Sequence, residues 1–149
     1  MTEISKEILI EASVEKIYNY VSEPRNIPQF WPGVLEIKNV KLLTNGGYSY
    51  LWTYKAAGIR FTGKGEGVDV TPNLRLISKN IGIIESLIAF TFRSIDHQTK
   101  VTLTVNYLIQ LPVIGQLSQN TFVKIYEPTV EMVLNNLKTK FETKPEDLK

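Results

Sequence analysis

The chain has 149 residues, of which 43% are hydrophobic and 21% charged, a composition typical of one globular domain rather than a disordered segment. It contains no cysteine and a single histidine, which excludes disulfides, thiol nucleophiles, iron–sulfur clusters and metal sites built from several histidines. The net charge of +2 is too small to indicate nucleic acid or an anionic membrane as the main partner.

The N-terminal region predicts one strand followed by two short helices. Residues 4–11 alternate apolar and polar side chains as a strand does. Ser13 has the position of a helix N-cap, and apolar residues at helical spacing continue toward Pro24. Pro28 begins a second, very short helix that contains Trp31.

The middle of the chain predicts six consecutive strands separated by short turns that contain Gly, Pro, Asn or Asp. Connections this short make neighbouring strands antiparallel. The predicted strands are 34–43, 48–57, 59–71, 74–81, 84–95 and 100–109.

After Pro112 the apolar spacing becomes helical again and predicts one long helix over residues 112–142, with a kink at Pro128. The order of elements predicts an α+β fold, in which a curved antiparallel sheet of seven strands wraps around this C-terminal helix. Residues 1–142 would form the single domain, and residues 143–149 a C-terminal tail.

A row of aromatic residues faces a row of glycines if Ala57 and Gly58 form a two-residue turn. This register predicts four cross-strand pairs: Tyr54 with Phe61, Trp52 with Gly63, Tyr50 with Gly65, and Tyr48 with Gly67. The same register pairs Glu66 with Lys79 on the opposite, solvated face. The glycines have two compatible interpretations: they curve the sheet, or they leave room for a cavity bordered by the aromatic rings.

The strands 84–95 and 100–109 add bulky residues to the same inner face, including Ile88, Phe90 and Tyr107. The inner surface is therefore almost entirely apolar and would enclose either a ligand pocket or a solid core.

No catalytic constellation is recognisable in the sequence. His97 lies in a turn, where a solvated position is expected, and Glu36 is either an inward acid or a surface strand residue. Tyr54, Tyr107 and Tyr126 could offer hydroxyl groups to a ligand, although buried tyrosines commonly bond to backbone.

Two segments of the N-terminal region carry a family resemblance: IEASVEKIY (residues 10–18) and IPQFWPGV (residues 27–34). They resemble the START and birch-pollen-allergen-like (SRPBCC) superfamily, nearest its polyketide cyclase/dehydrase and lipid transport group. The resemblance extends over residues 4–142 and implies a helix-grip fold. The superfamily includes carriers, cyclases, hydrolases and chaperone-binding modules, so the fold alone does not assign the function.

The leading hypothesis is a START-like domain that binds a small hydrophobic or amphipathic ligand, such as a lipid, isoprenoid, quinone or polyketide-like molecule, between the sheet and the C-terminal helix. The alternatives are a polyketide cyclase/dehydratase-type enzyme and a protein-interaction module of the chaperone-activator kind. The expected ligand-binding residues are Trp31, Trp52, Tyr54, Phe61, Gly63, Gly65, Ile88, Phe90, Tyr107, Leu117, Phe122, Ile125 and Tyr126. We expect no metal, no cofactor, no nucleic-acid partner, no integral membrane association and a cytoplasmic location.

Overall fold

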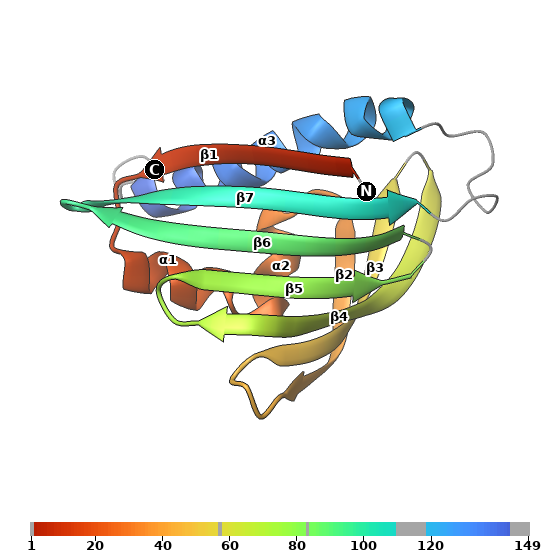
Figure 1. The fold of residues 1–149 in the computed structure, drawn as a ribbon, viewed down its shortest axis with the longest axis horizontal. Helices are drawn as coiled ribbons and strands as arrows, with labels where there is room; N and C mark the ends of the chain where they lie inside the picture. The colour runs from red at the N-terminus through yellow and green to blue at the C-terminus, as the bar shows by residue number, and fades with distance from the viewer. Residues whose placement is uncertain (1, 57, 83, 110–118, 144–149) are drawn as a thin grey trace.

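Seven antiparallel strands form one curved sheet in the order β1-β7-β6-β5-β4-β3-β2, which confirms the predicted seven-stranded sheet (Figure 1). This computed structural model describes residues 2–56, 58–82, 84–109 and 119–143. The strands are β1 (Thr2–Ile10), β2 (Val34–Leu42), β3 (Tyr48–Ala56), β4 (Ile59–Thr71), β5 (Arg75–Ile81), β6 (Ile84–Ile95) and β7 (Gln98–Ile109). Because β1 pairs with β7, the two edges of the sheet are β1 and β2.

The helical elements of the described residues lie on the concave side of the sheet (Figure 1). They are α1 (Val14–Val21), the 3₁₀ helix η1 (Pro24–Asn26), α2 (Ile27–Phe30) and α3 (Gln119–Glu142). Ser13 caps α1 as predicted, since its hydroxyl accepts a hydrogen bond from the backbone N–H of Lys16 at 3.4 Å. The two short helices after the first strand are thus confirmed, with η1 as an additional turn between them.

Helix α3 accounts for the described part of the predicted C-terminal helix, whose first residues, 112–118, lie outside the described residues. Pro128 lies inside α3, and the kink expected there stays a prediction. The side chain of Lys6 on β1 bridges Glu127 at 2.7 Å and Glu131 at 3.4 Å on α3, so the helix is tied to the edge strand beside it.

The hydrophobic core lies between α3 and the β1, β6 and β7 region of the sheet. It forms because alternate residues of β7 point to one face while α3 presents one apolar stripe. The most buried members of these two elements are Val101, Leu103, Val105, Tyr107, Val130, Val133 and Leu137. The space between α3 and this region of the sheet is therefore filled by side chains.

The register between β3 and β4 agrees with the sequence prediction. Trp52 pairs with Gly63 and Tyr50 pairs with Gly65, and Tyr54 pairs with Phe61 as well. The paired residues of β3 begin at Ser49, so the fourth predicted pair, Tyr48 with Gly67, is not part of this ladder.

The connection between β4 and β5 is longer than predicted. Residues 72–74 form the turn, where the sequence indicated two residues, and Asn73 adopts a left-handed backbone with φ of 65°. A bulge at Val68 then compensates for the extra residue. Glu66 consequently still pairs with Lys79, as predicted, because the bulge offsets the additional turn residue.

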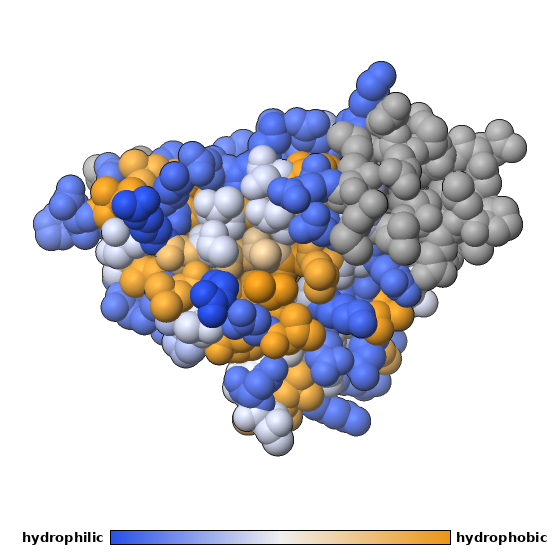
Figure 2. Space-filling model, in the orientation of Figure 1, coloured by the Kyte–Doolittle hydropathy of each residue, from blue (hydrophilic) through white to orange (hydrophobic). Residues whose placement is uncertain are grey.

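The outer face of the sheet is mixed in character, with hydrophilic residues around an apolar centre (Figure 2). Glu36 is exposed on β2 and pairs with Lys38 at 3.6 Å, so it does not point inward. His97 is exposed in the turn between β6 and β7, as expected. Among the described helices, none is long and apolar enough to cross a membrane.

Candidate ligand cavity

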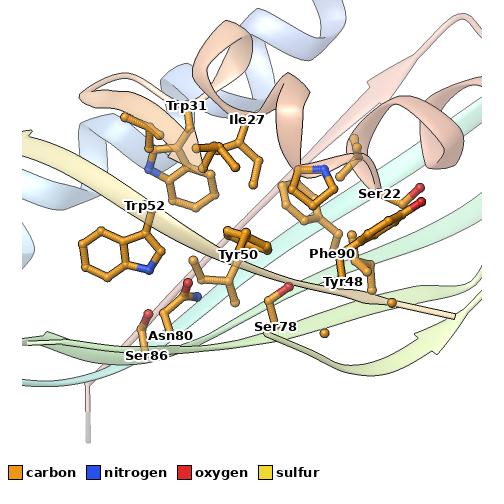
Figure 3. Close-up of a pocket in the computed structure, with 18 of the residues that line it drawn as sticks. Ser22, Ile27, Trp31, Tyr48, Tyr50, Trp52, Ser78, Asn80, Ser86 and Phe90 are labelled. Atoms are coloured by element: carbon orange, nitrogen blue, oxygen red, sulfur yellow. The ribbon is translucent and has the colours of Figure 1, made fainter. Parts of the chain in front are cut away.

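A cavity of about 370 Å³ lies between the concave face of the sheet, the α1–α2 region and α3 (Figure 3). Every strand except β1 contributes to its lining, because inward-facing residues alternate along each strand. Asn45, Gly46 and Pro72 are exposed members of the lining, so they lie at its outer end.

Aromatic rings from α2, α3 and the sheet form one wall of the cavity. Trp31, which follows α2, packs edge-to-face on Phe90 with ring centroids 6.5 Å apart. Tyr126 of α3 lies 6.5 Å from Trp31 and 6.4 Å from Tyr107 of β7. The indole N–H of Trp31 also donates a hydrogen bond to the Tyr126 hydroxyl. This wall is therefore a packed aromatic group with its own internal polar contact.

A row of polar residues crosses the floor of the cavity. The register places Tyr50, Gly65, Asn80, Ser86 and Tyr107 side by side on β3, β4, β5, β6 and β7. All of them except Gly65 line the cavity. The inner face thus has a row of polar residues on β3, β5, β6 and β7, which Gly65 interrupts on β4.

Two nitrogen donors of the cavity lining have no partner among the described residues. Nδ2 of Asn80 and Nε1 of Trp52 are both buried without an acceptor among the described residues. Asn80 as a whole is only 7% exposed. In Figure 3 the indole nitrogen of Trp52 points toward Asn80, so the two unpartnered groups lie at the same end of the cavity. Tyr18 carries a third unpartnered group, its hydroxyl, on α1.

Three tyrosines that line the cavity, Tyr50, Tyr54 and Tyr126, stay protonated at neutral pH. Burial raises the pKa of Tyr50 to about 12, although a hydrogen bond with Ser78 acts in the opposite direction. Burial also raises the pKa of Tyr54 and, more strongly, that of Tyr126, where the nearby Tyr54 adds to the effect. These side chains therefore act as neutral hydroxyl groups.

Residues 1–142 match the family model described as "Polyketide cyclase / dehydrase and lipid transport". The chain belongs to this family. No curated protein gives a significant match to the sequence.

Solved structures share the fold of this cyclase/dehydrase family member. TTHA0849 from Thermus thermophilus is 21% identical with a TM-score of 0.81, over 94% of this chain and 97% of that one. The Zhui aromatase/cyclase from a Streptomyces species is 13% identical with a TM-score of 0.82, over 95% and 93%. A START superfamily protein from Mycobacterium smegmatis is 16% identical with a TM-score of 0.80, over 94% and 97%. At these identities the likeness shows the helix-grip fold.

The cavity of this family member brings together eight of the thirteen residues that the sequence analysis expected at a binding site. These are Trp31, Trp52, Tyr54, Phe61, Ile88, Phe90, Tyr107 and Tyr126. Leu117 lies outside the described residues, as do the side chains of Phe122 and Ile125.

Gly63 and Gly65, which the sequence analysis also expected at the binding site, are not among the residues that line the cavity. The rings of Trp52 and Tyr50 lie directly over them and occupy the space there. The glycines therefore allow the rings to lie flat on the sheet, and the rings form the cavity surface.

Sequence reasoning missed Asn80 and Ser78 as site residues. Both lie on the same face of β5 as Leu76, so the alternation in this strand already indicated their inward direction. The available signal was the pairing of Glu66 with Lys79 on the solvated face, which directs the neighbours of Lys79 inward. Within the described ranges, no three His, Cys, Asp or Glu residues are grouped so that they could hold a metal ion.

Proposed function

We propose that this protein binds one small apolar molecule in the cavity between the sheet and α3. The observation that carries the proposal is the cavity itself, whose volume of about 370 Å³ lies within the range of ligand sites, roughly 300–1,000 Å³. Its wall of packed aromatic rings and its few polar groups match the usual composition of such sites.

Burial of apolar surface supplies the driving force for this binding. A ligand that removes roughly 200 Å² of apolar surface from water gains about 5 kcal/mol at about 25 cal/mol per Å². Association and ordering reduce that gain, so shape and preorganisation decide the affinity. The contacts of Trp31 with Phe90 and Tyr126 support a preformed wall that needs little ordering.

A cyclase or dehydratase is the second candidate function, because the family includes cyclases by its description and the fold resembles an aromatase/cyclase. Such a reaction needs a general acid or base near the substrate. The described lining contains no His, Asp, Glu, Lys or Arg, and burial raises the pKa of Tyr50 and Tyr126. This set of groups supports binding over acid–base chemistry.

The proposal is tested with N-phenyl-1-naphthylamine, an uncharged dye whose fluorescence increases in apolar surroundings. We expect saturable binding of one dye per chain. Ile88→Trp, which adds volume inside the cavity, should weaken binding at least tenfold. Leu87→Trp is the matched control, because Leu87 is 38% exposed and its side chain points to the opposite face of β6.

Native mass spectrometry of the purified protein complements the dye experiment, since a retained natural ligand appears as a fixed added mass. Absence of dye binding, or equal binding by both tryptophan variants, would contradict the proposal. That result would favour the interaction-module hypothesis.

A further inference from the structure

We propose that the ligand is an uncharged molecule that carries a carbonyl-type oxygen, and that this oxygen accepts hydrogen bonds from Asn80 and Trp52. This inference rests on the proposed function and specifies the chemistry of the bound molecule. It is carried by two features of the cavity: the absence of charged residues in its described lining and the two unpartnered donors at one end.

The lining disfavours a charged ligand. None of the described residues around the cavity is an Asp, Glu, Lys, Arg or His. The segment 110–118, which the structure does not describe, also contains no charged residue in its sequence. A carboxylate, phosphate or ammonium group in this cavity would lose its hydration without meeting an opposite charge, and that loss is expensive. Uncharged ligands avoid it.

The polar end of the cavity requires a hydrogen-bond acceptor. Nδ2 of Asn80 and Nε1 of Trp52 are donors, and both are buried without a partner in the described structure. A buried donor without an acceptor is more costly than a hydrogen bond is favourable. Water can accept from these groups before a ligand enters, but a hydrocarbon that displaces the water would leave both donors unpaired. An oxygen on the ligand prevents this.

The register puts both donors on the inner face of the sheet. Tyr50 pairs with Gly65, and Gly65 pairs with Asn80, so Asn80 lies two strands from β3 on the cavity floor. Trp52 is two residues beyond Tyr50 on the same face of β3. Figure 3 shows the nitrogen of Trp52 directed toward Asn80. A carbonyl oxygen has two lone pairs and can accept from both groups at once.

Two of the neighbouring hydroxyl groups, those of Ser78 and Tyr50, already contact each other. Ser78 hydrogen-bonds to the Tyr50 hydroxyl, so these two side chains are partly satisfied by each other. Asn80 and Trp52 are the residues of this end whose buried nitrogen donors have no partner among the described residues. Ketones, quinones, esters and amides have the required oxygen without a charge.

Three probes with one ring system test the inference: 2-acetylnaphthalene, 2-ethylnaphthalene and 2-naphthoate. They differ at a single substituent, which is an uncharged carbonyl, an alkyl group or a carboxylate. We expect the ketone to bind about three- to tenfold more tightly than the hydrocarbon, the gain typical of a net hydrogen bond. The carboxylate should bind at least tenfold more weakly than the ketone at neutral pH. Titration calorimetry measures all three.

Variants of Asn80 and Trp52 then test whether these residues cause the preference for the ketone over the hydrocarbon. Asn80→Leu keeps a side chain of similar size but removes one of the two donors, so the advantage of the ketone should become smaller while 2-ethylnaphthalene binds at least as well as before. Trp52→Phe removes the second donor, keeps a ring over Gly63, and serves as an independent variant if Asn80→Leu does not fold. Asn106→Leu is the matched control, because Asn106 does not line the cavity. It should leave the order of the three probes unchanged.

The outcomes separate this inference from the proposed function. Equal binding of the ketone and the hydrocarbon, or tightest binding of the carboxylate, would overturn the inference while the cavity remains a binding site. A ketone preference that is undiminished in both Asn80→Leu and Trp52→Phe would also overturn it. Failure of all three probes to bind would overturn the proposed function as well.

Discussion

Gly63 and Gly65 are the residues on which the aromatic surface of the cavity depends. A Cβ atom at Gly65 would collide with Tyr50, and its three nearest atoms all belong to that side chain. A Cβ atom at Gly63 would collide with the ring of Trp52 and would also lie 2.5 Å from the backbone carbonyl oxygen of Ile81. The closest contacts at Gly65 therefore come from a side chain alone, whereas those at Gly63 also include the backbone.

We predict that Gly63→Ala and Gly65→Ala each destabilise the protein by about 1–3 kcal/mol, the usual cost of overpacking. In a Tyr50→Ala background the cost of Gly65→Ala should fall close to zero, because the atoms nearest the new methyl group are then removed. In a Trp52→Ala background Gly63→Ala should keep part of its cost, because the carbonyl oxygen remains. Urea unfolding of the two double-mutant cycles measures both couplings.

The two cycles serve as controls for each other, since each combines the same glycine substitution with the removal of one ring. Complete rescue of Gly63→Ala by Trp52→Ala would show that the carbonyl of Ile81 moves away without cost, contrary to this interpretation.

Tyr50 couples the stability of the protein to alkaline pH. Burial raises its pKa from the ordinary tyrosine value of 10.0 to about 12, so the folded protein holds this proton more tightly than the unfolded chain does. The contribution is fully present below pH 10 and is lost as pH rises toward 12, where the unfolded chain has already released the proton.

We predict that the free energy of unfolding falls between pH 10 and 12, and that Tyr50→Phe makes this fall smaller by about 2–3 kcal/mol, since one pKa unit corresponds to about 1.4 kcal/mol. Urea titrations of both proteins at several pH values give the difference, in which the titration of lysines cancels. Identical pH profiles for the two proteins would show that Tyr50 is not protected from solvent in the folded state.

At the scale of strands and helices, the local patterns of the sequence predicted most of the fold correctly. Alternation, turn residues and the cap at Ser13 depend on neighbours in the chain, so they can be read without tertiary information. The bulge at Val68 could not be predicted in this way, because it depends on how β5 pairs after its longer turn. The observed ends of several strands differ from the predicted ends by one or two residues, because strand ends also depend on how neighbouring strands pair.

The candidate site was predicted less completely than the fold. Inward-facing aromatic residues such as Trp52 and Phe90 follow from strand alternation, and they do line the cavity. Whether the space above Gly63 is empty or filled by a ring depends on a side-chain rotamer across the sheet, which the pattern does not specify. The unpartnered state of Asn80 likewise depends on all the elements around it.

At the scale of the whole molecule, the concave side of the sheet holds both the hydrophobic core and the ligand cavity. The core beneath α3 is filled by fully buried residues such as Val101 and Val133, whereas the region between α2 and β5 encloses the cavity of about 370 Å³. A ligand that binds only the folded protein stabilises it by mass action. A side chain that fills the cavity leaves no space for that ligand. Such a variant therefore loses the stabilisation that the ligand provides.

We predict that N-phenyl-1-naphthylamine at 100 times its dissociation constant raises the free energy of unfolding of the natural protein by about 2.7 kcal/mol. Ile88→Trp should gain about 1.4 kcal/mol or less at the same concentration, because its indole occupies the cavity and weakens binding at least tenfold. Leu87→Trp, on the opposite face of β6, should gain as much as the natural protein does, and it controls for dye binding to an exposed tryptophan. Urea midpoints with and without dye measure the three gains. An equal gain in Ile88→Trp would mean that the dye stabilises the protein from a site outside this cavity.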